Sequence, residues 1–369
     1  MREILFVAGE ASGDLHTARV AAALSALRPD LRSVGVGGGE MRAAGVEIVQ
    51  DYEALAVMGF VEVLRHIPKH AALLRSLRAR MGGGNVAAVV VVDYPGFNMK
   101  VAAAAREAGV PVLYFITPQV WAWGAGRLPK LARLVSRAAV ILPFEEALLR
   151  GYGIDAHFVG HPLLDRAMNM PTREEARARL GIDAGEDVLV VFPGSRRQEI
   201  ARHLTPFMET AQAVVARRPE TRVLVHAAPT VELREGDVPF PVIRGGSFEA
   251  FRAADAAMCK SGTTTLEAAV AGCPLVVAYR ASSLSYAIAR RVVKITYIGL
   301  VNVVAGREVA PEFVQDALDP PRVASELLRL LGDRAHADVQ RAALAEVRAK
   351  LGTPGAARRV AEMISDLAG

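Results

Sequence analysis

The sequence predicts an α/β protein built from two doubly wound parallel sheets. Three observations indicate this: apolar runs that do not alternate with polar residues, helical patterns between those runs, and a restart of the same scheme near the middle of the chain. Strands of a parallel sheet are covered on both faces, so they read as continuous apolar runs. We therefore expect two Rossmann-like domains with a ligand-binding cleft between them.

The expected elements can be placed along the chain. In the first half, strands are expected at 4–9, 32–38, 86–93, 111–117 and 139–144, and helices at 12–27 and 99–109. In the second half, 188–200 and 255–272 each read as strand, glycine turn and helix, and 221–228 and 274–280 read as strands. A polar stretch, PTREEARARLGIDAGED, follows the segment HPLLD (161–165). We expect domains at 1–165 and 166–345 and a helical tail at 346–369 that can pack back on the first domain.

Composition limits the class of partner. The 369 residues carry a net charge of +5 and a sequence pI of about 9.4, which favours a phosphate, a nucleic acid or an acidic membrane surface. The chain starts without the layout of a signal peptide, and no apolar run approaches the ~18 residues that span a bilayer. We expect a cytoplasmic protein that can still lie against a membrane. Cys259 and Cys273 form no C-x-x-C pair and are expected to be buried free thiols.

Metal chemistry is not expected. The histidines form no H-x-x-H or H-E-x-x-H pattern, and the acids form no D-x-D pattern that would place Mg²⁺ on a diphosphate. The sequence therefore favours a reaction without metal or cofactor, with helix dipoles and arginine supplying positive charge.

The stretch VVVVDYPGFN (89–98) ends a buried strand in an acid and a turn. In open α/β sheets, ligands bind beyond the carboxyl ends of the strands. A carboxylate at that edge is costly unless it is hydrogen-bonded or kept for a task. Asp93 is therefore a candidate catalytic residue. The alternative is a structural role, such as capping the helix at Asn98.

Two turns in the second half could hold phosphate oxygens. In PGSRRQE (193–199) the glycine lets the backbone approach a ligand, helix-start N–H groups attract anions, and an arginine adds a fork-shaped cation. In KSGTTTLEAAVAG (260–272) hydroxyls and amides start another helix, and an acid one turn later could accept from a ribose diol. A plain turn and simple N-capping are the alternatives. The candidate binding residues are Gly194, Ser195, Arg196, Ser261, Gly262, Thr263, Thr264 and Glu267.

Three further segments are candidates for contacts. GEASGD (9–14) is the first-domain counterpart of these turns, whereas GVGGGEM (35–41) breaks the G-x-G-x-x-G pattern at Glu40 and is a weak signal. Trp121 and Trp123 could stack on a sugar or touch lipid, or could pack in the core.

The stretch 56–80 places an apolar stripe among basic residues. The stripe consists of Phe60, Val63, Leu64 and Ile67. This pattern suits a helix lying on anionic lipid, and an ordinary core-facing helix is the alternative. Pro68 favours two short helices over one.

The chain resembles one family, the lipid-A-disaccharide synthases of glycosyltransferase family 19. Ten segments carry the resemblance in order from the N-terminus to about residue 315: VAGEASGD, LAVMGFVEVL, VDYPGFN, PQVWAW, LPFE, VGHPLLD, FPGSRRQEI, KSGTTTLEAA, CPLVVAYR and NVVAGREVAPEF. The tail beyond residue 315 matches little by motif.

The resemblance implies a GT-B fold and a glycosyl transfer. The implied reaction is the inverting condensation of UDP-2,3-diacylglucosamine with 2,3-diacylglucosamine 1-phosphate. It gives the β-1,6-linked lipid A disaccharide 1-phosphate and UDP, at the inner face of the cytoplasmic membrane. The resemblance also implies that some members form homodimers by exchanging C-terminal parts. Its essential acid falls on Asp93 and its essential arginine on Arg196.

The implied mechanism assigns roles to particular residues. UDP is expected in the second domain, and Asp93 is expected to take the proton from the acceptor 6-hydroxyl as that oxygen attacks the anomeric carbon. His161 and His16 are the rival bases. The acceptor or cleft residues are expected to be Ser12, Gly13, Asp14, Asn98, Asn302, Arg307, Glu308 and Gln315.

Two departures from the family pattern and two other functions stay open. Gly96 stands where many members have a second acid, and the GAGR stretch after PQVWAW leaves Arg127 and Lys130 as phosphate candidates. A UDP-sugar 2-epimerase, or another GT-B transferase with a soluble acceptor, is the alternative enzyme. A non-catalytic nucleotide- or lipid-binding protein is the other class. A nucleic-acid partner is not expected, because the basic residues are not interleaved with aromatics as in a recognised module.

Overall fold

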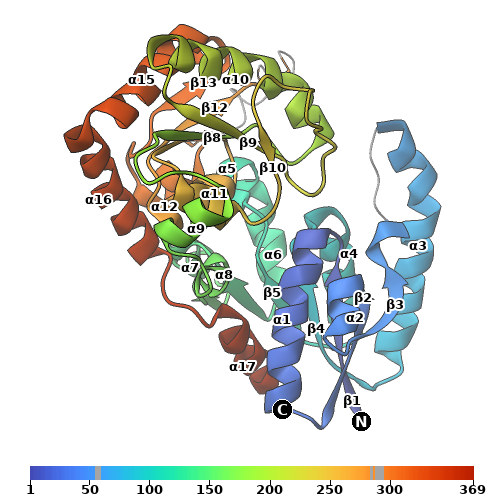
Figure 1. Ribbon diagram of the computed structural model, residues 1–369. Helices are drawn as coiled ribbons and strands as arrows, with labels where there is room; N and C mark the ends of the chain where they lie inside the picture. The colour runs from blue at the N-terminus through green and yellow to red at the C-terminus, as the bar shows by residue number, and fades with distance from the viewer. Residues whose placement is uncertain (55–59, 283–285, 287–294) are drawn as a thin grey trace. The chain divides into compact units, whose positions relative to one another are not determined.

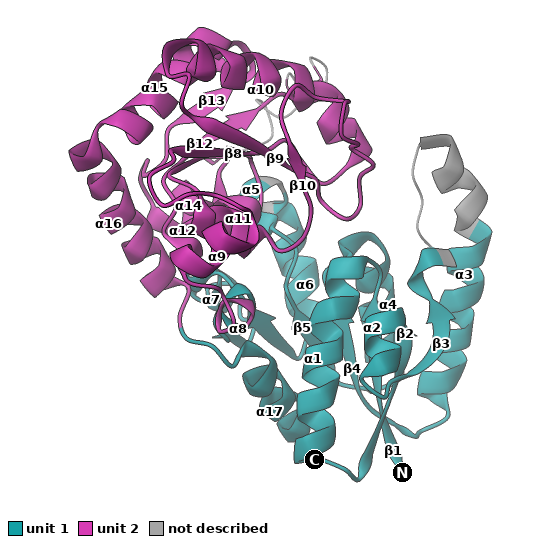
Figure 2. Ribbon diagram, viewed as in Figure 1, with its two compact units in different colours: residues 1–165, 353–369 teal, residues 166–352 magenta. Residues whose placement is uncertain are grey.

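The computed structural model describes residues 1–54, 60–282, 286 and 295–369, apart from the side chains of 54, 60–67, 123 and 125. The chain divides into two compact units (Figure 2). Unit 1 is Met1–Asp165 with Thr353–Gly369, and unit 2 is Arg166–Gly352. Each unit is an α/β body with one parallel sheet, the class that the sequence predicts (Figure 1).

The described part of unit 1 has a seven-stranded sheet in the order β3-β2-β1-β4-β5-β6-β7, and neighbouring strands run parallel. The strands are β1 (Arg2–Ala8), β2 (Leu31–Gly37), β3 (Glu47–Asp51), β4 (Val86–Val92), β5 (Val112–Phe115), β6 (Arg137–Val140) and β7 (Ala156–Phe158). Strands β3 and β7 were not expected from the sequence. β3 is an edge strand without a buried residue, and β7 is too short to form an apolar run.

Helices cover both faces of this sheet. One apolar cluster lies under α3 (Phe60–Gly82), α4 (Pro95–Glu107), α6 (Leu128–Leu134) and α7 (Pro143–Arg150). The other lies under α1 (Ala11–Leu27), α2 (Gly39–Ala43) and α17 (Ala356–Ala368). The short helix α5 (Val120–Trp123) follows β5, and α8 (Leu163–Ala167) spans the boundary between the two units. The 3-10 turns η1 (Tyr52–Ala54) and η2 (Ala125–Arg127) complete the unit.

Helix α3 corrects the expectation of two short helices. It is one helix that contains Pro68. A proline inside a helix costs about 3 kcal/mol because it removes a hydrogen bond and crowds the preceding turn. Downstream, Leu73, Leu77 and Met81 are buried in the unit-1 core, and each large apolar side chain contributes roughly 1.5–3 kcal/mol on burial. That burial outweighs the proline. The side chains of Phe60, Val63, Leu64 and Ile67 lie outside the described residues.

The C-terminal tail is helical and belongs to unit 1. Helix α17 packs beside α1, and Val360, Ala361 and Ile364 are buried with Phe6 and Leu24 (Figure 1). The expected start of the tail at residue 346 falls inside α16 (Arg334–Lys350), which is part of unit 2. Helix α16 packs against α12 (Thr264–Ala271) of unit 2. The chain therefore returns to unit 1 only after α16 has ended, at Thr353.

The described part of unit 2 has a six-stranded sheet in the order β10-β9-β8-β11-β12-β13, again with parallel neighbours. The strands are β8 (Val188–Phe192), β9 (Arg222–His226), β10 (Val242–Ile243), β11 (Ala256–Lys260), β12 (Leu275–Tyr279) and β13 (Glu312–Val314). β10 and β13 were not expected, since two and three residues make no recognisable run. The remaining elements are α9 (Arg173–Arg179), α10 (Arg197–Arg217), α11 (Ser247–Ala253), α14 (Leu300–Ala305), η3 (Gln315–Ala317) and α15 (Pro320–Gly332).

Two sequence expectations about the whole chain can be compared with the structure. Cys259 and Cys273 are buried free thiols, as expected, and burial raises the pKa of Cys273 to about 12. Among the helices that the structure describes, none combines the length and the apolar character needed to cross a bilayer.

The strand orders identify where ligands are expected. The chain starts each sheet near its middle and builds outward in both directions, so the order reverses between β1 and β4 and between β8 and β11. In open α/β sheets, the crevice beyond the carboxyl ends of such a pair is the usual binding site. A bound ligand is therefore expected at the turns after these four strands.

Candidate functional site

The carboxyl edge of unit 1 brings GEASGD and VDYPGFN together. Ala8 of β1 and Val92 of β4 are register partners, so the turns after them are neighbours. A Cβ on Gly9 would lie 2.3 Å from the Tyr94 ring, which means that this ring packs directly on the glycine backbone. The Tyr94 hydroxyl in turn lies 3.3 Å from Nε2 of His70. Sequence reasoning missed Gly9, Tyr94 and His70 as members of this site. The signal was a glycine and an aromatic residue at the two strand ends.

The backbone at this edge is strained. Asp93 and Tyr94 have φ of 45° and 46°, and Ile116 after β5 has φ of 58°. Non-glycine residues in this left-handed region cost of order 1–3 kcal/mol each, and such strain gathers at functional sites. The Asp93 carbonyl is held by two donors, the Tyr114 hydroxyl and the Asn98 amide, each at 2.8 Å. The residue itself is half-buried, so its side chain is not hidden inside the sheet.

Asn98 supports the backbone of Asp93 through its side-chain amide. It is fully buried, and Nδ2 also donates to the carbonyls of Val92 at 3.0 Å and Val7 at 3.3 Å. The backbone N–H of Asn98 donates to the Tyr94 carbonyl. The structure gives Asn98 the task of fixing the turn between β4 and α4, and its predicted contact with an acceptor stays a prediction.

The three residues Ser12, Gly13 and Asp14 lie in the first turn of α1. Ser12 is exposed, whereas Asp14 is buried. Asp14 accepts backbone N–H groups from Gly38 at 2.7 Å, Glu40 at 3.0 Å and Met41 at 3.2 Å. These bonds start helix α2, so the carboxylate has a structural task. Its predicted role toward an acceptor is not tested by this geometry.

Trp121 is tied to a buried acid. Its indole N–H donates to Glu145 at 3.0 Å, and its ring packs edge-on against Phe144. Glu145 also accepts the N–H of Leu142 at 3.1 Å. Burial raises the pKa of Glu145 to about 7, although these hydrogen bonds oppose the rise. Sequence reasoning missed Glu145, whose only signal was the LPFE segment.

The other first-domain candidates occupy different surroundings. Arg127 directly precedes α6 and Lys130 lies in its first turn, and both residues are exposed. Of the rival bases, His161 is buried and its Nδ1 accepts the N–H of Leu163 at 3.1 Å. His16 contacts the Phe115 ring edge-on. The side chain of Trp123 lies outside the described residues.

The two predicted phosphate turns of unit 2 are neighbours. Phe192 of β8 and Cys259 of β11 are register partners, so Gly194–Arg196 and Ser261–Thr264 follow adjacent strands at one edge. Gly194 has φ of 143° and Gly262 has φ of 146°, conformations that favour glycine. Arg196 is exposed at the start of α10, with 73% of its side chain open to solvent. The arrangement presents helix-start amides and a cation at one edge, which suits an anion.

An ion pair that the sequence analysis missed joins the two turns. Lys260 Nζ lies 2.8 Å from Glu199, and both side chains are largely buried. Glu199 also accepts the Ser195 N–H at 3.0 Å. The buried His203 lies 3.0 Å from the Pro193 carbonyl through Nδ1, and its Nε2 accepts the Arg280 N–H at 3.0 Å. Burial lowers the pKa of His203, which favours the neutral ring that this pair of contacts requires.

Two of the hydroxyls in residues 261–265 donate to backbone carbonyls, and the other two belong to residues that are at least partly exposed. Ser261 donates to the Ile298 carbonyl at 2.7 Å, and Thr265 donates to the Gly262 carbonyl at 2.9 Å. Thr263 is exposed and Thr264 is half-buried at the start of α12. Glu267 is buried and pairs with Arg166 at 2.9 Å. Its predicted role toward a ribose stays a prediction.

The four residues of the NVVAGREVAPEFVQ segment are not alike. Asn302 is fully buried, donates to Ala310 and Glu312, and accepts the N–H groups of Val309 and Ala310. Gln315 has φ of 56°, and its side chain accepts the N–H of Ala281 at 2.6 Å.

Arg307 and Glu308 are exposed, and Arg307 pairs with Glu346 at 2.7 Å. The structure thus assigns Asn302 and Gln315 to loop support, and contact with a ligand stays a prediction for the four residues. In the described part of the chain, no three or more His, Cys, Asp or Glu residues gather as metal ligands would. The expectation of a metal-free reaction stays a prediction.

Comparisons with known proteins agree over nearly the full length of the chain. The family model described as lipid-A-disaccharide synthetase matches residues 4–364. The chain is 44% identical to the lipid-A-disaccharide synthase of Anaeromyxobacter dehalogenans, over 98% of this chain and 96% of that protein. It is 41% identical to the enzyme of the same name from Geobacter sulfurreducens, over 99% of this chain and 97% of that protein.

Solved structures with low sequence identity share the fold. Acinetobacter baumannii MurG has a TM-score of 0.59 at 16% identity, covering 99% of this chain and all of that one. UDP-GlcNAc 2-epimerase from Neisseria meningitidis, bound to UDP-GlcNAc, has a TM-score of 0.64 at 12% identity, with 99% and 100% covered. These likenesses confirm the GT-B fold. The family-model match over residues 4–364 and the relatives at 41% and 44% identity show that the chain belongs to the lipid-A-disaccharide synthetase family.

Proposed function

We propose that the protein is an inverting, UDP-sugar-dependent glycosyltransferase that makes the lipid A disaccharide. The donor is UDP-2,3-diacylglucosamine, and the acceptor is 2,3-diacylglucosamine 1-phosphate. The products are the β-1,6-linked disaccharide 1-phosphate and UDP. The observation that carries the proposal is family membership over nearly the full length at 44% identity.

Unit 2 is proposed to bind the UDP part of the donor. The edge formed by Gly194–Arg196 and Ser261–Thr264 offers helix-start amides, two glycines without side chains and the exposed Arg196. A diphosphate carries the charge that such an edge attracts. Glu267 is proposed to accept from the ribose hydroxyls with its carboxylate, which Arg166 orients.

Unit 1 is proposed to bind the acceptor and to supply the base. Asp93 takes the proton from the acceptor 6-hydroxyl, that oxygen forms the bond to the anomeric carbon, and the bond to UDP breaks with its electrons leaving on the phosphate. A positioned general base typically raises the reaction rate 10²–10⁴-fold. The strain at Asp93 and Tyr94 supports the choice of Asp93, because the fold keeps a costly turn at that point.

The membrane contact is proposed on chemical grounds. Both substrates carry acyl chains, so the protein must reach lipid, and a net charge of +5 favours an anionic surface at the cytoplasmic face. In the described part of α3, Lys69 and Arg75 are exposed, whereas Arg78 and Arg80 pair with Glu107 and Glu3. The free cations of that stretch are therefore fewer than the sequence suggests. Homodimer formation also stays a proposal.

The deciding experiment follows the products by mass. The protein is incubated with UDP-2,3-diacylglucosamine, with and without the 1-phosphate acceptor. We expect disaccharide 1-phosphate and UDP in equal amounts, and only when the acceptor is present. A UDP-sugar 2-epimerase would convert the donor without any acceptor, and a transferase with a soluble acceptor would leave the lipid acceptor unchanged. Either of those results would reject the proposal.

A further inference from the structure

The ion pair between Lys260 and Glu199 occupies the point where the two turns of unit 2 meet. Lys260 ends β11, and Glu199 lies in the first turn of α10. Their side chains are 17% and 13% exposed, yet both belong to the edge where the backbone turns toward solvent. Within the described residues, the Lys260 ammonium pairs with Glu199, and an ammonium has three N–H donors. Donors are left for a further acceptor.

The glycines of both turns make room for this pair. A Cβ on Gly194 would lie 2.7 Å from Cβ of Glu199, and a Cβ on Gly262 would lie 3.3 Å from Nζ of Lys260. A side chain on Gly194 would displace the acid, and one on Gly262 would crowd the ammonium. Each glycine therefore serves two purposes, because it adopts a left-handed φ and leaves space beside one member of the pair.

Glu199 organises three groups around one carboxylate. Oε1 lies 2.8 Å from Lys260 Nζ and 3.8 Å from an Arg196 nitrogen, and Oε2 accepts the Ser195 N–H. Burial alone would raise the pKa of Glu199. The hydrogen bond and charge of Lys260, together with the Ser195 N–H and the charge of Arg196, outweigh burial and lower that pKa. The acid is therefore ionised at neutral pH, and it holds a lysine and an arginine of the same edge.

We propose that the Lys260 ammonium binds the diphosphate of the nucleotide, and that Glu199 is the residue that positions Lys260 and the Ser195 amide for that contact. The proposal rests on the proposed function in one respect, namely that unit 2 binds a nucleoside diphosphate. It adds a cation to the predicted set of Gly194, Ser195 and Arg196, and it explains why a lysine is placed directly before Ser261. Lys260 supplies a compact charge, whereas the exposed Arg196 supplies a fork.

Binding measurements with two ligands test the phosphate contact. The affinities of UDP and of uridine are measured by calorimetry without any acceptor. Lys260→Met should weaken UDP binding about 10- to 100-fold, since a hydrogen bond to a charged group is lost. Uridine binding should stay unchanged, because uridine has no phosphate. Lys260→Arg should keep most of the affinity for UDP. Lys350→Met, the same exchange at an exposed lysine of unit 2, should change neither affinity.

A double variant separates the proposal from a purely structural ion pair. If Lys260 only neutralises Glu199, then Glu199→Gln and Lys260→Met should be equally harmful, and the variant carrying both should recover UDP binding. If Lys260 touches the diphosphate, Glu199→Gln should weaken UDP binding less than Lys260→Met does, because the glutamine amide oxygen can still accept from Lys260 or from the Ser195 N–H. The double variant should then stay as weak as Lys260→Met. The double variant has no unpaired buried charge. Where Lys260→Met alone does not fold, the double variant is compared with the wild type, and a loss of UDP affinity of about 10- to 100-fold supports the contact.

The outcomes distinguish this inference from the proposed function. Recovery in the double variant, or equal losses for UDP and uridine in Lys260→Met, would overturn the role of Lys260. Failure to form the disaccharide would reject the proposed function and leave a phosphate-dependent Lys260 contact intact, because UDP binding is measured without transfer. A wild-type protein that binds UDP no better than uridine would reject the inference whatever reaction the chain catalyses.

Discussion

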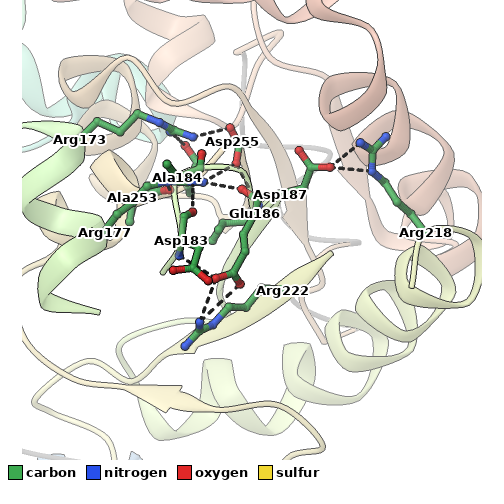
Figure 3. Close-up of polar contacts among 12 residues, drawn as sticks. Arg173, Arg177, Asp183, Ala184, Glu186, Asp187, Arg218, Arg222, Ala253 and Asp255 are labelled. Atoms are coloured by element: carbon green, nitrogen blue, oxygen red, sulfur yellow. Dashed lines mark hydrogen bonds and ion pairs between the residues drawn. The ribbon is translucent and has the colours of Figure 1, made fainter. Parts of the chain in front are cut away.

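The amino and carboxyl edges of the two parallel sheets carry charged residues in different ways. At the amino edges, charges are joined in dense pairs: Arg80 holds Glu3 through two bonds of 2.7 and 2.9 Å in unit 1. In unit 2, Arg177 and Arg173 both hold Asp255, just before β11 (Figure 3). Figure 3 also shows the ion pairs of Arg218 with Asp187 and of Arg222 with Glu186. At the carboxyl edges the backbone is strained and Arg196 is exposed. The ion pair at the unit-2 carboxyl edge, Lys260 with Glu199, leaves ammonium donors over within the described residues.

The difference separates charges that hold the fold from charges kept for a ligand. Arg177 is buried and donates to four backbone carbonyls as well as to Asp255, so its donors are consumed within the unit. Strain is absent from the non-glycine residues at the amino edges that the structure describes, whereas Asp93, Tyr94, Ile116 and Gln315 follow strand ends at the carboxyl edges. Charge alone is therefore a poor guide to a site, and strain with exposure is a better one.

The largest expected effect is on catalysis at the unit-1 carboxyl edge. Asp93→Asn should lower kcat about 10²–10⁴-fold, because the amide cannot take a proton. The thermal midpoint should change little, since the Asp93 carbonyl keeps its two hydrogen bonds. Turnover is measured by disaccharide formation and stability by thermal unfolding. Asp366→Asn, at an exposed acid of α17, is the matched control. Near-normal turnover in a folded Asp93→Asn variant would move the role to another residue.

The opposite pattern is expected at the unit-2 amino edge. Arg177→Met should lower the free energy of unfolding by about 3–5 kcal/mol, since it leaves Asp255 and several carbonyls short of a donor. UDP affinity, measured well below the unfolding temperature, should stay unchanged. Arg334→Met changes an arginine that is 93% exposed and should cost about 0–0.5 kcal/mol. Weaker UDP binding without a loss of stability would contradict the division between the two edges.

Two acids, the half-buried Asp255 and the buried Glu145, sharpen the comparison through pH. Asp255 has two arginines, whereas in the described residues Glu145 forms no ion pair and has a pKa raised from 4.5 to about 7. A carboxyl whose pKa is higher in the folded than in the unfolded state binds more protons when the protein is folded. Its contribution to the free energy of unfolding is therefore fully present below about pH 4.5 and is lost as the pH rises through about 7.

The difference in the free energy of unfolding between Glu145→Gln and the wild type should therefore favour the variant more at pH 8 than at pH 5, by up to about 3 kcal/mol. Chemical denaturation at the two pH values measures this difference. Glu235→Gln, at an exposed acid, should show no such dependence. Parallel stability profiles for the wild type and Glu145→Gln would mean that burial does not control this acid.

The smallest expected effect concerns a turn glycine. Gly194→Ala should cost about 1–3 kcal/mol of stability, because alanine is strained at φ of 143° and its Cβ would press on Glu199. UDP binding should weaken as well, by about tenfold if Glu199 shifts. Gly185→Ala, where a Cβ meets nothing within 4 Å, is the control. Equal behaviour of the two variants would remove the turn from the binding edge.

Much of the fold and part of the site followed from the sequence. Strands β1, β4, β8 and β11 were predicted because buried parallel strands are continuous apolar runs, and the turns after them were predicted with their glycines. The order strand, turn, helix fixes which residues stand at the carboxyl edge, so Asp93 and Arg196 could be named before any contact was known. Short strands such as β10 and β13 could not, since pairing with long neighbours holds them in place.

The tertiary structure decided which side chains meet. Asp14 could be placed in a turn from the sequence, but its three bonds to residues 38–41 depend on where α2 lies. The pair Lys260 and Glu199 depends on β8 and β11 being neighbours, although 61 positions separate the two residues (260 − 199). Sequence patterns report local backbone preference and burial, which act over a few residues. Contacts between distant residues are set by strand order and helix packing, and those form only when the whole sheet does.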